Sequence, residues 1–172
     1  QVEGLKIYFD TPHGILKAVD GVSFDVERRS VFGLVGESGS GKTLTALSTL
    51  KLIKAPGYIA GGGIYFNGMD LLKEDEKVLR CIRGARIAMV FQEPASAFNP
   101  VFTIGYQITE SVLTHQNISK NEAEKLALEF LKKVHIPDPK KIYHDYPHQL
   151  SGGTKQRAMI AMALVNSPEL LI

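Results

Sequence analysis

The 172-residue sequence lacks the features that mark several protein classes. Its single cysteine, Cys81, cannot form an internal disulfide, which excludes a disulfide framework and fits a reducing compartment. The longest apolar run, Ala158–Val165, falls well short of the roughly 18 residues that a membrane-spanning helix needs. Lysine and arginine (20) nearly balance aspartate and glutamate (18) and form only doublets such as Lys132-Lys133. A nucleic-acid-binding surface is therefore not expected.

The composition is that of an ordinary globular protein. Apolar residues make up 44% of the chain and charged residues 22%, without the bias of collagen or of disordered chains. A chain of this length forms one domain, or a large piece of one.

Strand-like and helix-like apolar patterns alternate along the chain, and the compact run at 31–35 is typical of a buried parallel strand. Strands are expected at 5–9, 18–26, 31–35, 64–66, 87–91 and from 170 onwards. Helices are expected at 42–52 and 74–83, at two places between 100 and 137, and at 151–166; the second of the middle pair opens with a Ser119/Glu122 capping box. Gln92–Pro100 is expected to be irregular. This alternation predicts an α/β fold with a mainly parallel central sheet.

Two segments that contain glycine, Gly61–Gly63 and Asn67-Gly68, lie on either side of the expected strand at 64–66. Asn67-Gly68 predicts a tight hairpin turn after the strand at 64–66. Gly61–Gly63 leads into that strand and not into a helix, so it is interpreted as a loop without a ligand.

A third glycine-rich segment carries the chemistry, and it lies between the expected strand at 31–35 and the expected helix at 42–52. It reads Gly36-Glu37-Ser38-Gly39-Ser40-Gly41-Lys42-Thr43 and fits the P-loop pattern G-x-x-x-x-G-K-[ST]. Glycines let successive backbone N–H groups point at a phosphate, and a helix N-terminus adds partial positive charge. Lys42 would reach the β- and γ-phosphates, and Thr43 would offer a hydroxyl to Mg²⁺. A flexible turn is the alternative, but the strand–loop–helix context favours nucleotide binding.

A second candidate anion site opens the last expected helix. It reads Leu150-Ser151-Gly152-Gly153-Thr154-Lys155-Gln156-Arg157. Alone, a serine followed by two glycines is better explained as an ordinary N-cap. Together with the P-loop, however, L-S-G-G-x-x-Q-R resembles the signature sequence of ABC-transporter ATPases. Gln92, just after the expected strand at 87–91, stands where that family places its Q-loop glutamine.

Further segments resemble the dipeptide and oligopeptide importer ATPases, a subfamily that includes nickel-importer subunits. These segments are Phe91-Gln92-Glu93-Pro94, Ala97-Phe98-Asn99-Pro100, Thr103-Ile104-Gly105 and Tyr146-Pro147-His148-Gln149. The resemblance covers essentially all of residues 1–172, but only the N-terminal, larger part of a family nucleotide-binding domain. It implies a P-loop NTPase fold with antiparallel N-terminal strands, a core of about 1–91 and 167–172, and a helical subdomain of about 92–166. The chain is expected to be truncated before the Walker B carboxylates.

The resemblance also implies a role for each matching residue. Gly36–Thr43 would bind ATP and Mg²⁺, with Lys42 and Gln92 as catalytic residues and Thr43 and Gln92 at the metal. Ser151, Gly152, Gly153 and Gln156 would contact the ATP held by a facing subunit. Thr154-Lys155 replaces the more usual Met-Arg pair, a change expected to leave phosphate contact unaffected. The adenine-stacking residue stays open among Tyr8, Phe9 and His13.

The protein so implied is the ATP-hydrolysing subunit of a peptide-type importer, peripheral to the cytoplasmic face of the membrane. Its partners would be a second ATPase subunit, identical or not and arranged head to tail, integral permease subunits and, indirectly, an external solute-binding protein, but no nucleic acid. The alternatives are a non-transport ABC ATPase and a nucleotide-binding fragment without turnover. Because the Walker B aspartate, the catalytic glutamate and the switch histidine do not occur in these residues, the fragment alone is expected to be inactive. His144 and His148, separated by Pro147, are not expected to bind a metal. The transported solute cannot be read from these residues.

Overall fold

A computed structural model describes the backbone of residues 1–172 and the side chains of 1–94 and 97–172. The chain forms two compact units, Gln1–Leu79 and Arg80–Ile172, and each is described by itself. The division predicted from the sequence, a core of about 1–91 and 167–172 and a helical subdomain of about 92–166, has its boundary near residue 92 and not between Leu79 and Arg80. That division stays a prediction.

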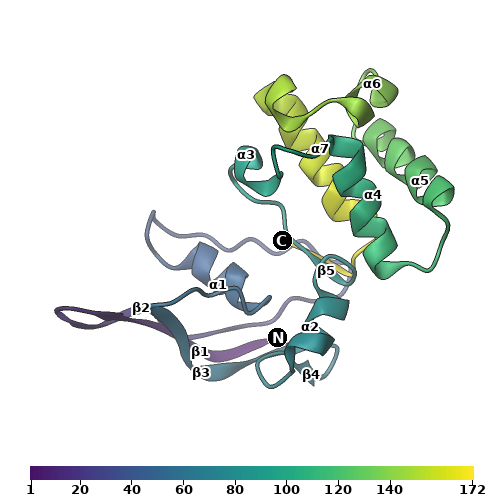
Figure 1. Ribbon diagram of the computed structural model, residues 1–172. Helices are drawn as coiled ribbons and strands as arrows, with labels where there is room; N and C mark the ends of the chain where they lie inside the picture. Colours follow the sequence, from purple (N-terminus) through teal and green to yellow (C-terminus); the bar gives the residue numbers. More distant parts are fainter. The chain divides into compact units, whose positions relative to one another are not determined.

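The first unit is built on an antiparallel sheet in the order β2-β1-β3-β4 (Figure 1). The strands are β1 (Val2–Thr11), β2 (Gly14–Phe24), β3 (Gly57–Phe66) and β4 (Met69–Asp70). Leu5, Ile7 and Ile64 are buried, and Asn67 and Gly68 turn the chain with φ values of 51° and 82°. The expected N-terminal strands and the hairpin turn are therefore confirmed.

The interpretation of Gly61–Gly63 as a loop is wrong, because all three glycines lie within β3. Gly61 pairs with Lys6 and Gly63 with Glu3, across an irregularity in the register. Gly62 has φ +93°, and a Cβ there would lie 2.6 Å from the carbonyl oxygen of Glu3. The glycines therefore allow β1 to approach closely at a bulge, a role that Gly often has inside strands.

The expected buried strand at 31–35 is also wrong. The segment is irregular, Val31 is fully exposed and Val35 is 91% exposed. The Phe32 ring stacks on Phe24, with ring centroids 5.0 Å apart. A strand needs a neighbour that accepts and donates its backbone hydrogen bonds. Among the described residues, neither sheet places a strand beside 31–35. The following helix, α1 (Lys42–Ser48), is shorter than expected, and the chain leaves it through Lys51 at φ 54°.

Parallel pairing occurs in the second unit. After α2 (Glu76–Ile82), which crosses the unit boundary, β5 (Ile87–Ala88) pairs in parallel with β6 (Leu170–Leu171). The Val90 N–H donates to the Ile172 carbonyl at 2.7 Å and extends this pairing. The expected strands at 87–91 and from 170 onwards are therefore confirmed in a shorter form, and the structure adds that they are neighbours. Phe91 and Leu171 are exposed.

The helices of the second unit pack around one apolar core (Figure 1). They are α3 (Pro94–Ala97), α4 (Ile104–His115), α5 (Lys120–Lys133), α6 (Pro139–His144), the short 3₁₀ helix η1 (Pro147–Gln149) and α7 (Gly152–Leu164). Helices α4, α5 and α7 and the Ser119/Glu122 capping box are as expected. Helix α3 was not expected, because it is a single short turn that begins at a proline within the stretch expected to be irregular. Helix α6, which has six residues and also begins at a proline, was not predicted either.

Candidate phosphate-binding site

The loop at 36–41 ends at α1 in a conformation that only glycine adopts readily. Gly41, the N-cap of α1, has φ 87°. A Cβ there would lie 2.8 Å from both the Ala18 carbonyl oxygen and the Val19 side chain. As a glycine, the N-cap residue of α1 has no side chain that could accept a hydrogen bond from the first turn of the helix. A side chain at this position would fill the space that brings the loop onto the sheet, so the cradle depends on the missing Cβ.

Lys42 places its ammonium against the same loop. Its Nζ donates to the carbonyl oxygens of Gly36 (2.7 Å) and Glu37 (2.6 Å) and lies 3.2 Å from Ser40 Oγ. These acceptors match the three donors of an ammonium group. An incoming phosphate must therefore replace at least one of them, and a charge-assisted bond to phosphate is stronger than one to a neutral carbonyl. Thr43 is exposed one residue further on, so its hydroxyl is accessible to a metal ion.

The signature residues lie on the surface at the start of α7. Ser151 is the N-cap, and its Oγ accepts the Thr154 N–H at 3.3 Å. Thr154 Oγ1 lies 2.9 Å from the same Oγ. Gly152, Gly153 and Gln156 are exposed, and a Cβ added at either glycine would meet nothing within 4 Å. The start of α7 therefore exposes the Ser151 hydroxyl and, at Gly152 and Gly153, backbone without side chains to solvent.

Contacts on both sides hold this turn in place. Leu150 is buried, and Arg157 Nη1 donates to the carbonyl oxygens of Val134 (3.3 Å) and His135 (2.9 Å) at the end of α5. Because carbonyl groups at a helix C-terminus carry partial negative charge, Arg157 caps α5 while belonging to α7. Arg157 is part of the L-S-G-G-x-x-Q-R motif, but the resemblance implies no role for it.

Gln92 lies just beyond the β5–β6 pairing and two residues before α3. Its side chain is exposed, and α3 packs against α7.

A second glutamine, Gln107, holds the loop at 99–102 in place and was not among the predicted site residues. The buried Gln107 accepts the Asn99 N–H at 2.8 Å and donates to the Asn99 and Phe102 carbonyls, both at 3.0 Å. The sequence does contain a sign of this role, because Gln107 is a polar residue between Ile104 and Ile108 in the apolar stripe of α4.

The expected site residues therefore belong to both units. Gly36–Thr43 is one continuous segment of the first unit, made of the loop 36–41 and the first two residues of α1, while Gln92 and the signature residues belong to the second unit.

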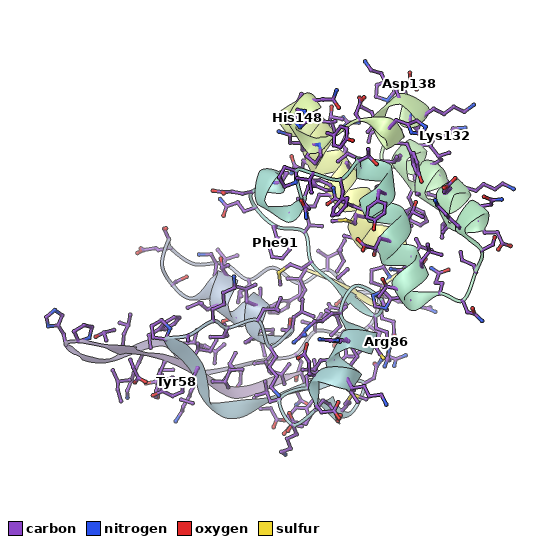
Figure 2. The ribbon with its side chains drawn as sticks, viewed as in Figure 1. Tyr58, Arg86, Phe91, Lys132, Asp138 and His148 are labelled. Carbon is purple, nitrogen blue, oxygen red and sulfur yellow. The ribbon has the colours of Figure 1, made fainter. Side chains whose placement is uncertain are left out.

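The three candidates for adenine stacking have different surroundings. The Tyr8 hydroxyl donates to Asp20 at 2.6 Å, which raises the pKa of Tyr8 and lowers the pKa of Asp20. Tyr8 also meets Tyr58 edge to face, and Figure 2 shows Tyr58 on β3. A Cβ at Gly57 would lie 2.6 Å from the Phe9 ring, so Phe9 packs closely on that glycine. His13 is exposed in the β1–β2 turn.

Among the described side chains, no group of three or more His, Cys, Asp or Glu is arranged to hold a metal ion. The His148 ring stacks on Tyr146, with centroids 5.7 Å apart (Figure 2 labels His148). In the part of the chain that the structure describes, no helix has both the length and the apolar character to cross a bilayer.

Comparison with known proteins identifies the family. Residues 19–172 match the model of the ABC transporter family. The chain is 47% identical to the probable peptide ABC transporter ATP-binding protein y4tR of Sinorhizobium fredii, over 99% of this chain and 51% of that protein. It is 43% identical to the dipeptide transport ATP-binding protein DppD of Escherichia coli, over 99% and 52%. The chain therefore belongs to the ABC transporter family, and it spans about half the length of the curated relatives it matches.

A solved structure gives the same fold. The dimeric post-hydrolysis state of the ATP-binding cassette MJ0796, bound to ADP and Pi, superposes with a TM-score of 0.88 at 26% identity, over 99% of this chain and 71% of that one. This likeness confirms the expected α/β P-loop NTPase fold class with antiparallel N-terminal strands. The mainly parallel central sheet that was also expected is not formed by the described residues, because 31–35 is not a strand and the parallel sheet consists of β5 and β6 alone.

Proposed function

We propose that this protein is the ATP-binding subunit of an ABC transporter and couples ATP hydrolysis to the import of peptides or a related small solute. The observation that carries the proposal is the Gly36–Thr43 segment, in which Lys42, the first residue of α1, donates from its Nζ to the carbonyl oxygens of Gly36 and Glu37 in the preceding loop. The relatives named as peptide and dipeptide transport proteins support the choice of solute.

The residues divide the work at the nucleotide. Gly36–Gly41 would surround the phosphates with backbone N–H groups, and Lys42 would supply the positive charge. The Thr43 hydroxyl and the Gln92 side-chain oxygen are hard donors of the kind that Mg²⁺ prefers. When bound, Mg²⁺ neutralises charge on the phosphates. Lys42 and Gln92 are therefore the proposed catalytic residues of this chain.

The exposed signature residues suit a contact in trans. Ser151, Gly152, Gly153 and Gln156 would face the γ-phosphate of ATP on a second ATPase subunit, identical or homologous, arranged head to tail. The dimeric state of the MJ0796 cassette supports such a partner. The remaining partners would be integral permease subunits, with a solute-binding protein acting through them, and the subunit would sit peripherally at the cytoplasmic face of the membrane.

Titration of the full gene product with ATP tests the nucleotide assignment. Lys42→Ala should raise the Kd for ATP at least about tenfold, because a charge-assisted bond to the phosphates is lost. Lys54→Ala removes an exposed lysine from the same unit and should leave the Kd unchanged. Equal affinity for ATP in both variants, with unchanged circular dichroism, would show that Lys42 does not bind the phosphates.

Transport of the solute needs a separate experiment. The subunit is reconstituted in liposomes with permease subunits and a solute-binding protein from the same organism, and uptake of a labelled dipeptide is followed with ATP at the face that carries the subunit. We expect uptake with wild-type protein and none with Lys42→Ala. ATP-dependent turnover without dipeptide uptake would keep the ATPase assignment and reject peptides as the solute.

A further inference from the structure

Two serine N-caps in the second unit have the same backbone geometry and different partners. Ser119 caps α5 and Ser151 caps α7, and each accepts the N–H of the third helical residue at 3.3 Å. That third residue is Glu122 in α5 and Thr154 in α7. The difference decides what happens to the proton of the serine hydroxyl.

In α5 the Ser119 hydroxyl proton forms a hydrogen bond within the cap. An ionised carboxylate can only accept hydrogen bonds. Ser119 Oγ therefore donates to Glu122 Oε2, at 2.6 Å, and the Ser119 N–H donates to the same oxygen at 2.9 Å. This serine has no proton left for an external anion.

In α7 the third residue is a hydroxyl and can act as the donor. Ser151 Oγ and Thr154 Oγ1 lie 2.9 Å apart, so one of the two donates to the other. If Thr154 donates, the Thr154 N–H and O–H fill the two acceptor positions of Ser151 Oγ. The single proton of Ser151 then points away from the helix. Ser151 is exposed and Thr154 is half-buried, so the outward direction is solvent.

We propose that Thr154 is a positioning residue that donates its hydroxyl proton to Ser151 Oγ and so presents Ser151 as a hydrogen-bond donor to a phosphate oxygen. An anion in front of Ser151 favours this arrangement, because a hydrogen bond from a hydroxyl to a charged acceptor is stronger than one to a neutral hydroxyl. The inference rests on the proposed function, in which Ser151 contacts the nucleotide of a facing subunit. It departs from the expectation that Thr154 leaves phosphate contact unaffected.

The experiment measures dimer formation of the full gene product by sedimentation at increasing concentrations of the ATP analogue AMP-PNP with Mg²⁺. Thr154→Val keeps the shape of the side chain and removes its hydroxyl, and it should raise the concentration for half-maximal dimer by about three- to tenfold, the effect of one hydrogen bond. Thr154→Ser restores the hydroxyl and should behave like wild type. Thr154→Ala, with a good helix former, should match Thr154→Val even if valine disturbs the turn.

A double-mutant cycle shows whether Thr154 acts through Ser151. Ser151→Ala should weaken dimer formation, and Thr154→Val should add nothing in that background, while the affinity of the monomer for AMP-PNP stays constant throughout. An ineffective Ser151→Ala would refute the trans contact of the proposed function. An effective Ser151→Ala with a silent Thr154→Val, a loss that Thr154→Ser fails to restore, or a Thr154→Val effect that persists without Ser151 would overturn the positioning role alone.

Discussion

The apolar run at 31–35 and the apolar stripe of α4 have similar composition and opposite surroundings. Val31 and Val35 are almost wholly exposed, whereas Ile104, Ile108 and Val112 are completely buried. The stripe on α4 meets similar stripes on α5 and α7, at Ala127, Leu131 and Ala158 among others. A helix satisfies its own backbone hydrogen bonds before it packs, but a strand does so only beside another strand. The same apolar residues therefore become core in one place and surface in the other.

The largest effect is expected at the glycine-rich start of α1, because Gly41 leaves no room for a Cβ while Gly153 at the start of α7 does. Gly41→Ala forces a left-handed backbone on alanine and brings Cβ within 2.8 Å of the Ala18 carbonyl oxygen. We expect a loss of about 3 kcal/mol in the free energy of unfolding, together with weaker ATP binding. Gly153→Ala is the matched control, since its Cβ meets nothing and alanine favours a helix by up to about 1 kcal/mol. Urea denaturation measures both, and equal stability of the two variants would contradict the cradle geometry.

A matched pair of valines tests the comparison directly. Val112→Ala removes two buried carbons and should cost about 2 kcal/mol in the free energy of unfolding, from lost transfer energy and a small cavity. Val35→Ala should cost less than about 0.5 kcal/mol, because Val35 is 91% exposed. Chemical denaturation of the full gene product measures the difference. Equal losses would show that 31–35 is packed in that protein.

The same contrast explains how far the sequence predicted the fold. Helices α5 and α7 were predicted well because the Ser119/Glu122 capping box and the signature Ser151 are local signals. The predictions of a strand at 31–35 and of a loop at Gly61–Gly63 were wrong, because strand pairing and the close approach of β1 depend on residues that are distant in the sequence.

The site was predicted in the same uneven way. The P-loop and signature were found because their residues are contiguous. The contacts of Arg157 with the end of α5, and of Gln107 with the loop at 99–102, join separate segments, and the motif spacing gives no sign of them.

A smaller effect is expected where α7 contacts the end of α5. Arg157→Met keeps much of the side-chain length and removes the donors to Val134 and His135, and it should lower the free energy of unfolding by about 1 kcal/mol. Lys155→Met removes a charge from the same helix as a control. Amide hydrogen exchange should locate the loss of protection in the last turn of α5. A uniform loss along both units would mean that Arg157 does not act as a local cap.

The smallest effect concerns the pH dependence of the helical unit. The Ser119 hydroxyl, and then the Ser119 N–H, donate to Glu122 and hold its pKa below the ordinary value. A carboxyl whose pKa is lower in the folded state contributes stability that is fully present above its unfolded pKa, near 4.3, and is lost as the pH falls through the folded pKa. Glu122→Gln keeps an oxygen acceptor without the charge, so it should lower Tm by no more than about 1 °C at pH 7. The difference should disappear under acid conditions, below the folded pKa of Glu122. Glu110→Gln, at an exposed carboxylate of α4, serves as the control in the same thermal scans. A difference that grows as the pH falls would give the opposite sign and would show that the Glu122 carboxylate does not stabilise the start of α5.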